Sequence, residues 1–391
     1  MKNNRNDFVI ENNVLKKYVG KDRIVRIPDG VEIVGYKSFK NCDWIRKVIL
    51  PDSLNKIEEY AFSGCENLYD LKFSPLILLP LIKIESRAFE GCKKLVDENG
   101  FVIVNNVLFN FFGNDEVVKV PDNVTLILDG VFEGCTWIKK AILPEGLKWF
   151  SSEVFKNCDN LESIYIPSNI NIRGMDNFKG CKKLADENGF VIVNNVLFDY
   201  FGNDEVVKVP DNVTIISYGV FEGCTWIKKA ILPEGLKWFS GDVFKNCVNL
   251  ESINIPSNIV LWGNDNFKGC NKLADENGFF IDNNVLIKYF GKDRIIRIPD
   301  GITSINFDAF DYCESMEFVV IPTSIKEIDE VCGISDLTII CAEDSYAAEY
   351  AERFDIPCIE IPEDEFQAGL TQEEIEEYIE VYQKEKEGLT L

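Results

Sequence analysis

Apolar and polar residues follow one another along residues 161–181 in an order that recurs through most of the chain. Leu161, Ile164 and Ile166 are spaced by three and two residues, and Phe178 and Cys181 close the segment as F-x-x-C. The alternation around Ile164 and Ile166 predicts a short strand with one face inward. The same ending recurs at Cys42, Cys65, Cys92, Cys135, Cys158, Cys181, Cys224, Cys247, Cys270 and Cys313, and the commonest spacing is 23 residues. A fixed step of this length predicts one structural unit per repeat, stacked into a solenoid.

A longer period of about 90 residues overlies the short one. Segments that begin at Phe8, Phe101, Phe190 and Phe279 each predict two strands joined by an Asn-Asn turn, followed by a third strand that ends in Pro-Asp. Asparagine tolerates the positive φ angles of a tight hairpin turn. Residues 97–183 and 186–272 are nearly identical, which indicates a duplicated block of 89 residues.

The end of the repeats predicts a cap. Residues 316–359 keep only part of the pattern, and within them Asp344–Phe354 predicts a short helix with Ala347, Tyr350 and Ala351 on one face. A degenerate closing unit suits the end of a solenoid, which would otherwise expose its core. We therefore expect one solenoid domain over residues 1–359, including this cap.

The composition changes over residues 360–391, which hold 11 acidic residues and two lysines. Thr371 and Glu374 predict a capping box at a helix start, with Leu370 and Ile375 as a hydrophobic staple. Ile375, Tyr378, Ile379 and Tyr382 then form an apolar stripe on an amphipathic helix. Two interpretations stay open: a helix that lies on the solenoid or in solvent, and a docking helix for a partner or a second copy.

The charge balance restricts the partners. With 65 acidic and 41 basic residues the chain has a formal net charge of −24, which argues against nonspecific binding to nucleic acid or to anionic membranes. The longest apolar run, Pro75–Ile82, is too short for a membrane span. No signal-peptide core follows Met1. We expect a cytoplasmic protein if Met1 is the native start, and a secreted or cell-surface protein if the sequence is trimmed.

The repeated motifs resemble those of one family. F-x-x-C followed by L-x-x-I-x-I-P, the 23-residue step and the F-x-I-x-N-N-V-L hairpins resemble the BspA-like leucine-rich repeats of bacterial and some protozoan proteins over residues 8–359. The resemblance implies a right-handed, β-rich solenoid with hairpin insertions that is used for binding, often in adhesion at a cell surface. It implies no catalytic residues.

Candidate chemistry is sparse. The chain contains no histidine, which removes His-dependent nucleophilic catalysis and His metal sites. C-x-x-C pairs, phosphate-binding loops and dinucleotide-binding motifs are also missing from the sequence. The ten repeated cysteines occupy one position of the unit, so we expect a ladder of buried, free thiols. We therefore predict no enzymatic activity and no cofactor or metal.

The outward positions of the predicted strands carry the candidate binding surface. In L-x-x-L-x-L the residue between the last two core positions points away from the core. These residues are Arg26, Ile49, Lys72, Lys119, Ile142, Tyr165, Lys208, Ile231, Asn254 and Arg297, continued by Val320 and Thr338. None is a carboxylate, and Lys47, Lys140 and Lys229 lie two positions earlier on the same side. The alternative interpretation is that Ile, Val, Tyr and Thr are simply good strand formers.

Two further features leave alternatives open. Trp44, Trp137 and Trp226 follow the cysteines, and Trp149 and Trp238 lie in the L-K-W-F connection; we expect them to cover a flank of the core rather than to form an interface. The insertion Pro75–Ile82 either fills the core locally or forms an exposed apolar loop.

Two classes of function remain. The first is a non-catalytic scaffold that presents a concave strand ladder, with its basic and aliphatic stripe, to a protein or an anionic polymer. The second is a self-associating structural protein or a cell-surface adhesin.

Overall fold

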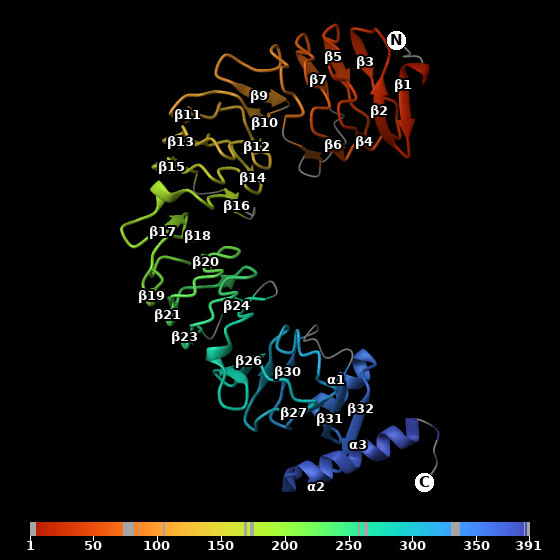
Figure 1. Ribbon diagram of the computed structural model, residues 1–391, viewed down its shortest axis with the longest axis vertical. Coiled ribbons are helices and arrows are strands. Elements are labelled where there is room, and N and C mark those ends of the chain that lie inside the picture. Colours follow the sequence, from red (N-terminus) through yellow and green to blue (C-terminus); the bar gives the residue numbers. More distant parts are fainter. Residues whose placement is uncertain are drawn as a thin grey trace. The chain divides into compact units, whose positions relative to one another are not determined.

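Short strands joined by tight turns make up almost the whole chain in the computed structural model (Figure 1). The structure describes residues 5–72, 82–85, 87–104, 106–167, 170–172, 176–256, 259–261, 265–329, 337–386 and 388. The chain forms two compact units, Met1–Gly202 (unit 1) and Asn203–Leu391 (unit 2).

Unit 1 begins with a 3₁₀ turn, Arg5–Asp7, and contains a second one at Lys182–Leu184. Its strands are β1 (Phe8–Glu11), β2 (Val14–Tyr18), β3 (Ile24–Arg26), β4 (Ile33–Val34), β5 (Lys47–Ile49), β6 (Lys56–Ile57), β7 (Asp70–Lys72), β8 (Lys83–Ile84), β9 (Phe101–Val104), β10 (Val107–Phe111), β11 (Val117–Lys119), β12 (Leu126–Ile127), β13 (Lys140–Ile142), β14 (Trp149–Phe150), β15 (Ser163–Tyr165), β16 (Asn171–Ile172), β17 (Phe190–Val193) and β18 (Val196–Tyr200).

Unit 2 contains the remaining strands and the α-helices, with a 3₁₀ turn at Asn271–Leu273. Its elements are β19 (Val206–Lys208), β20 (Ile215–Ile216), β21 (Lys229–Ile231), β22 (Trp238–Phe239), β23 (Ser252–Asn254), β24 (Val260–Leu261), β25 (Phe279–Asp282), β26 (Val285–Tyr289), β27 (Ile295–Arg297), β28 (Ser304–Ile305), β29 (Phe318–Val320), β30 (Glu327–Ile328), β31 (Thr338–Ala342), α1 (Tyr346–Phe354), β32 (Cys358–Ile361), α2 (Glu363–Ala368) and α3 (Gln372–Lys386).

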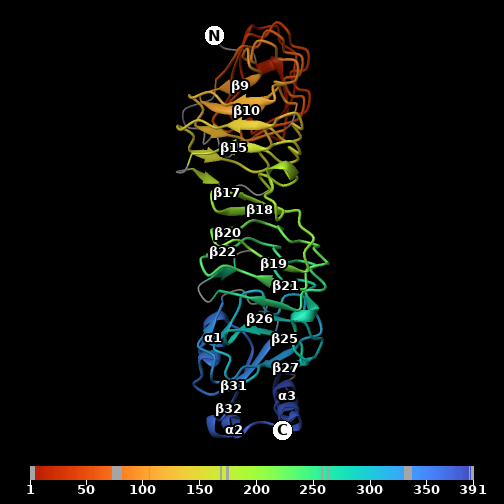
Figure 2. The ribbon, with the colours of Figure 1, turned by 90° about the vertical axis from the view of Figure 1, so that its left-hand side faces the viewer.

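Parallel pairing between successive turns produces two kinds of sheet on opposite sides of the core. We call the sheets built from the L-x-x-L-x-L strands the long ladders: β3–β5–β7 is the first, β11–β13–β15 the second, β19–β21–β23 the third and β27–β29–β31–β32 the fourth. The two-residue strands form the short ladders, for example β4–β6–β8, β12–β14–β16 and β20–β22–β24. Figure 2 faces the side on which the long ladders of unit 2 lie. The predicted β-rich solenoid is therefore confirmed.

The hairpins begin each block as predicted. β9 and β10 pair antiparallel, and β10 also pairs parallel with β12 of the next turn. In the third hairpin Asn194 and Asn195 have φ angles of 50° and 63°, which asparagine adopts at lower cost than most residues. The hairpin thus supplies one full turn of the solenoid, with β10 in a short ladder and β11 in a long one.

The F-x-x-C motif closes each turn and joins it to the next. The carbonyl of Phe155 accepts the N–H of Cys158 at 3.1 Å and the Sγ–H of Cys181, from the following turn, at 3.0 Å. The ring of Phe155 stacks between those of Phe132 and Phe178, with centroids 4.8 and 5.9 Å apart. One phenylalanine therefore carries both the turn and the contact between turns, which explains why its type and spacing recur.

The predicted cysteine ladder is buried. Six of its thiols donate to a phenylalanine carbonyl of the preceding turn at 3.0–3.2 Å. Burial raises the pKa of the Cys42 thiol to about 11 and that of Cys92 to about 12. Cys313, at the end of the ladder, is only half-buried. Cys42 and Cys92 are therefore ordinary core groups, because the thiol rather than the reactive thiolate is favoured.

The C-terminal cap follows the sequence prediction. Ser345 caps α1, whose residues Ala347, Tyr350 and Ala351 are buried. Thr371 and Glu374 form the expected capping box at the start of α3: the Thr371 N–H donates to the Glu374 carboxylate at 2.7 Å, and the Glu374 N–H donates to the Thr371 hydroxyl at 3.2 Å. β32 pairs with β31 and runs to Ile361, beyond position 359. The division of the chain at residues 359 and 360 stays a prediction.

Candidate functional site

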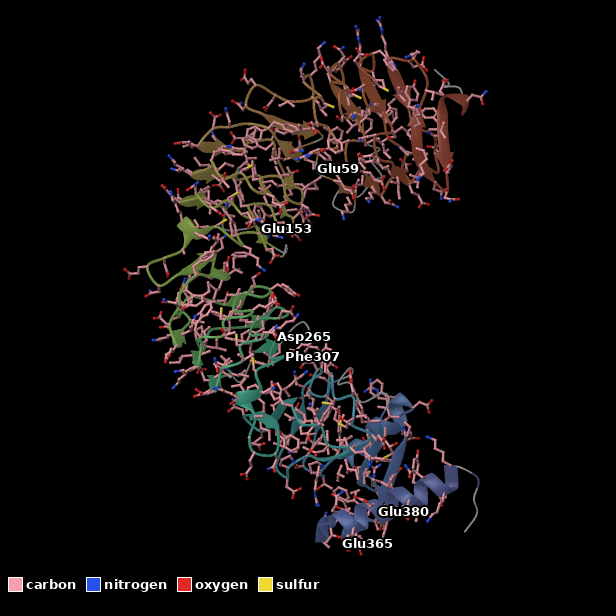
Figure 3. The ribbon with its side chains drawn as sticks, in the orientation of Figure 1. Glu59, Glu153, Asp265, Phe307, Glu365 and Glu380 are labelled. Carbon is pink, nitrogen blue, oxygen red and sulfur yellow. The ribbon has the colours of Figure 1, made fainter. Side chains whose placement is uncertain are left out.

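The outward rows of the long ladders contain all ten candidate residues. In the second long ladder Lys119, Ile142 and Tyr165 lie in register on neighbouring strands, and Val117, Lys140 and Ser163 form the parallel row beside them. The third long ladder repeats this arrangement with Lys208, Ile231 and Asn254. Figure 3 shows the side chains that project from both sides of these units. The strand register therefore brings the candidates together ladder by ladder.

The exposure of these residues differs along the rows. The charged and polar candidates are exposed, among them Lys72, Lys119 and Lys208, whereas Ile49, Ile142 and Ile231 are half-buried. Tyr165 is 48 % exposed, and Val117 and Val206 in the adjacent row are 55 % and 53 % exposed. Apolar side chains of this size are thus open to solvent beside the lysines of the second and third long ladders.

Within the outward rows of the second and third long ladders the charged side chains are lysines, whereas lysines and glutamates alternate at the edge of these rows. The outward rows of the second long ladder contain Lys119 and Lys140 and no carboxylate. Directly before these strands lie exposed ion pairs, such as Lys139–Glu116 at 2.9 Å, whose equivalent in the third long ladder is Lys228–Glu205, also at 2.9 Å. The first long ladder differs, because its Asp70 pairs with Lys47.

Candidates that take part in contacts within the fold include Asn254, Tyr165 and Arg297. The side-chain amide of Asn254 accepts the Leu232 N–H at 2.8 Å and donates to the Leu232 carbonyl at 3.1 Å. The Tyr165 hydroxyl donates to the Glu145 carboxylate, which raises the Tyr165 pKa. Arg297 donates to the carbonyl of Leu370. Glu145 and Leu370, the partners of Tyr165 and Arg297, lie outside the strand pattern, so the repeat could not predict these two contacts.

The fourth long ladder is covered by the acidic tail. Val320 and Ile340 lie in register on β29 and β31, and both are buried together with Ile375 and Ile379 of α3. Val320 is therefore not exposed. Thr338 pairs with Phe318 in the other row, so its assignment beside Val320 is wrong. Of the two interpretations of the tail, the structure shows the helix lying on the solenoid.

The expectation that the stripe lies on a concave ladder is wrong for each unit taken by itself. Within unit 1 the first and second long ladders follow the outer side of the bend, and β4, β6, β12, β14 and β16 follow the inner side (Figure 1). In unit 2 the third long ladder is again on the outer side and β20 and β24 on the inner side. Where helices oppose strands, the wider helices spread the outer side, because helices pack 8–10 Å apart and strands about 4.8 Å. Here strands occupy both sides of the solenoid and have the same spacing, so this difference in spacing does not predict which side becomes concave.

Trp44 packs against the core, as expected, whereas the other four of these tryptophans do not follow the expectation that they cover a flank of the core. Trp137, Trp149, Trp226 and Trp238 are 40–54 % exposed, whereas Trp44 is half-buried. Trp149 and Trp238 are the outward residues of two-residue strands, whose inward partners are phenylalanines. Two carboxylates of unit 1, Glu59 and Glu153, lie in the turns that follow the short-ladder strands β6 and β14 (Figure 3). Of the insertion Pro75–Ile82, only Ile82 lies within the described residues, and it is buried.

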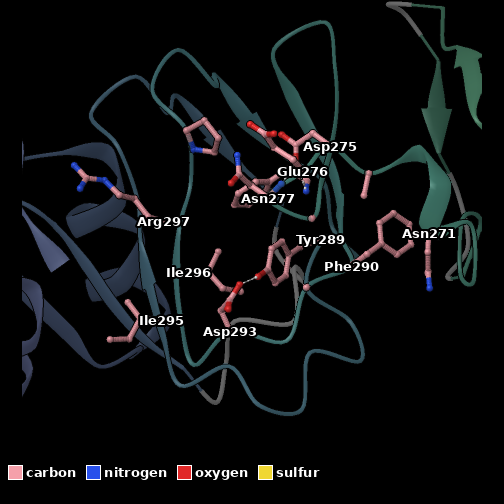
Figure 4. A pocket seen from close by; sticks show the side chains of 15 residues that line it. Asn271, Asp275, Glu276, Asn277, Tyr289, Phe290, Asp293, Ile295, Ile296 and Arg297 are labelled. Atoms are coloured by element: carbon pink, nitrogen blue, oxygen red, sulfur yellow. Dashed lines mark hydrogen bonds between the residues drawn. The ribbon is translucent and has the colours of Figure 1, made fainter.

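A cavity of about 620 Å³ lies in unit 2 beside β26 and β27 (Figure 4). Two of its aspartates serve the fold: one Asp275 carboxylate oxygen accepts the N–H groups of Asn277 and Phe279 at 2.9 Å, and Asp293 accepts the Tyr289 hydroxyl. Burial and the neighbouring Asp293 raise the Tyr289 pKa. Among the described residues there is no cluster of three or more His, Cys, Asp or Glu side chains suited to a metal ion.

None of the helices within the described residues is both long enough and apolar enough to cross a membrane.

Comparison with known proteins identifies the repeats. The sequence model of the BspA type leucine rich repeat region matches in six copies, over residues 10–99, 77–185, 191–293 and 281–333. A search of the curated proteins finds no match.

Similar solved structures include a leucine-rich cell surface protein from Faecalibacterium prausnitzii, which is 22 % identical, with 88 % of this chain and 94 % of that chain covered and a TM-score of 0.34. A leucine-rich repeat protein from Bacteroides ovatus is 17 % identical, with 90 % and 97 % covered and a TM-score of 0.30. The pneumococcal vaccine antigen PcpA is 16 % identical, with 91 % and 98 % covered and a TM-score of 0.28.

Proposed function

Because the chain belongs to the BspA-type leucine-rich-repeat family, we propose that it is a non-catalytic protein-binding scaffold. It binds its partner through the outward faces of the second and third long ladders. The partner surface is acidic and partly apolar, and it contacts lysine and aliphatic side chains together.

One observation carries the proposal: the strands of each of these two faces combine two exposed lysines with exposed or half-buried apolar side chains and contain no carboxylate. In the third long ladder these residues are Lys208, Lys229, Val206 and Ile231. The protein as a whole has 65 acidic residues and a net charge of −24. Exposed charges act over about 8 Å at physiological salt, so a local basic face is attractive at contact although the body repels anions at a distance.

The lysines and the apolar side chains of these faces act on different steps of binding. Lysines at an interface raise the association rate and make it sensitive to salt. Exposed apolar side chains supply contact area that excludes water, which is where most binding energy resides. A partner that lacks either property should bind this face poorly.

The test compares capture of proteins by matched variants of the full chain. Wild type, Lys119→Glu/Lys208→Glu and Lys148→Glu/Lys237→Glu are immobilised and exposed to a lysate of the source cells at low and high salt, and the retained proteins are quantified. Lys148 and Lys237 are also exposed, but they precede β14 and β22 on the other side of the same turns. We expect the first double variant to reduce retention of specific proteins by more than roughly tenfold and the second to leave it unchanged. Identical retention by all three proteins refutes the proposal.

A further inference from the structure

The fourth long ladder already holds an amphipathic helix on its outward face. Phe318, Val320 and Ile340 are 4 %, 2 % and 0 % exposed, because Leu370, Ile375 and Ile379 pack against them. Arg297, at the end of β27, donates to the carbonyl of Leu370, the residue that directly precedes the Thr371–Glu374 capping box. The face thus combines an apolar floor with a cation that fastens the chain at the start of the helix.

The 89-residue period places the same residue types on the uncovered ladders. Subtracting 89 from 297 and 320 gives Lys208 and Ile231, and subtracting it again gives Lys119 and Ile142. These pairs occupy the same strand positions, a basic residue on the first strand and an aliphatic residue on the second. In the second and third long ladders no segment of the described chain covers them, and the lysines and Val117 and Val206 are exposed.

The chemistry of α3 indicates what such a face accepts. Its 15 residues include six glutamates and two lysines, a net charge of −4, around an apolar stripe that contains Ile375 and Ile379. The position of Phe318 is taken by Lys140 in the second long ladder and by Lys229 in the third. The uncovered faces therefore offer less apolar area and one more positive charge each, which favours an occupant with an acidic polar face.

We propose that the second and third long ladders each bind an amphipathic helix with an acidic polar face, presented by another protein, in the way the fourth long ladder holds α3. This inference rests on the proposed function and specifies the class of partner. The helix lies with its aliphatic stripe over Ile142 or Ile231, and Lys119 or Lys208 binds a carbonyl or carboxylate near its N-terminus.

The probe is a synthetic peptide with the sequence of residues 370–386, blocked at both ends and labelled with a fluorophore. Its binding to the full chain is followed by fluorescence anisotropy. Concentrations extend to about 1 mM, because a weak contact between a peptide and a groove is expected to have a dissociation constant up to this value. We expect saturable binding that weakens by roughly tenfold in Lys119→Glu/Lys208→Glu and by less than about twofold in Lys148→Glu/Lys237→Glu. A peptide with Ile375→Asp and Ile379→Asp should not bind.

Hydrogen exchange of the full chain with saturating peptide locates the contact. We expect slower exchange within residues 117–142 and 206–231 and unchanged exchange within residues 372–386. Faster exchange of residues 372–386, with binding insensitive to the lysine variants, means that the peptide replaces α3 on the fourth long ladder and overturns the inference. The absence of binding at the highest concentration overturns it as well.

The two proposals fail separately. If the peptide does not bind but Lys119→Glu/Lys208→Glu still retains fewer proteins from the lysate than wild type does, the proposed scaffold function is supported and its partner is not a helix. If neither assay responds to the lysine variants, both are wrong. Peptide-independent association of the chain with itself, abolished by the same variants, shows that the occupant is a second copy and contradicts the inference.

Discussion

Alkaline pH should destabilise this protein through its buried thiols. Burial raises the pKa of Cys92, Cys135 and Cys181 to about 12 each, whereas an unfolded cysteine titrates near 8.5. Between these values the unfolded chain loses the thiol proton and the folded chain keeps it. The unfolded state then binds fewer protons, so the free energy of unfolding falls as the pH rises.

As long as the folded thiols stay protonated, the size of the effect depends on how far the pH lies above the pKa of the unfolded thiols. The pKa of an unfolded thiol lies about 1.5 units below pH 10. Ionisation of each such thiol in the unfolded state therefore lowers the free energy of unfolding by about 2 kcal/mol at this pH. Cys92, Cys135 and Cys181 together therefore account for about 6 kcal/mol, against a total stability of about 5–15 kcal/mol for a typical protein. Their burial, with 1 %, 5 % and 0 % exposure, keeps the folded thiols neutral at this pH.

Urea denaturation followed by far-UV circular dichroism at pH 7.5 and pH 10, in a phosphine reductant, measures this loss. Replacing Cys181 by Ala should make the loss between the two pH values smaller by about 2 kcal/mol, because one titrating group is gone. Val154→Ala is the control: Val154 is equally buried but has no proton to lose, so it should lower stability equally at both pH values. If Cys181→Ala loses as much stability as wild type on going to pH 10, the reasoning is wrong.

Three other substitutions test the packing. Phe155→Ala removes a ring stacked on both faces and should lower the free energy of unfolding by about 3–5 kcal/mol in urea; a loss below 1 kcal/mol would contradict the role of the stack. Ile379→Asp places a carboxylate at a site 2 % exposed and should speed hydrogen exchange throughout α3, whereas Val381→Asp, at 41 % exposure, should not. Asn284→Ala, at a φ of 61°, should cost about 1–2 kcal/mol in thermal unfolding, and Asn284→Gly much less.

Most of the fold could be predicted from the sequence because its determinants are local. Phe155 and Cys158 are three residues apart and close one turn, and Asn194 and Asn195 are adjacent. The capping box of Thr371 and Glu374 likewise spans a single helical turn. Each of these patterns fixes backbone geometry over a few residues, and repetition then fixes the stacking.

The candidate site was only partly predictable. The alternation along β11, β13 and β15 determines that Lys119, Ile142 and Tyr165 point outward, since strand side chains alternate between faces. It does not determine whether anything covers them. Val320 follows the same pattern as Ile142, yet it is buried beneath α3.

The sequence by itself determined the repeat, the strand positions, the hairpins, the cap and the outward residues of the first three long ladders, because each depends on neighbours within one or two turns. The tertiary structure alone decided that the long ladders lie on the outer side of each unit's bend, that the tryptophans of the short ladders are exposed, and that the tail covers the fourth long ladder. Arg297 and Leu370 are 73 residues apart. Contacts over such distances depend on how complete surfaces fit together, and no local pattern of apolar and polar residues encodes that fit.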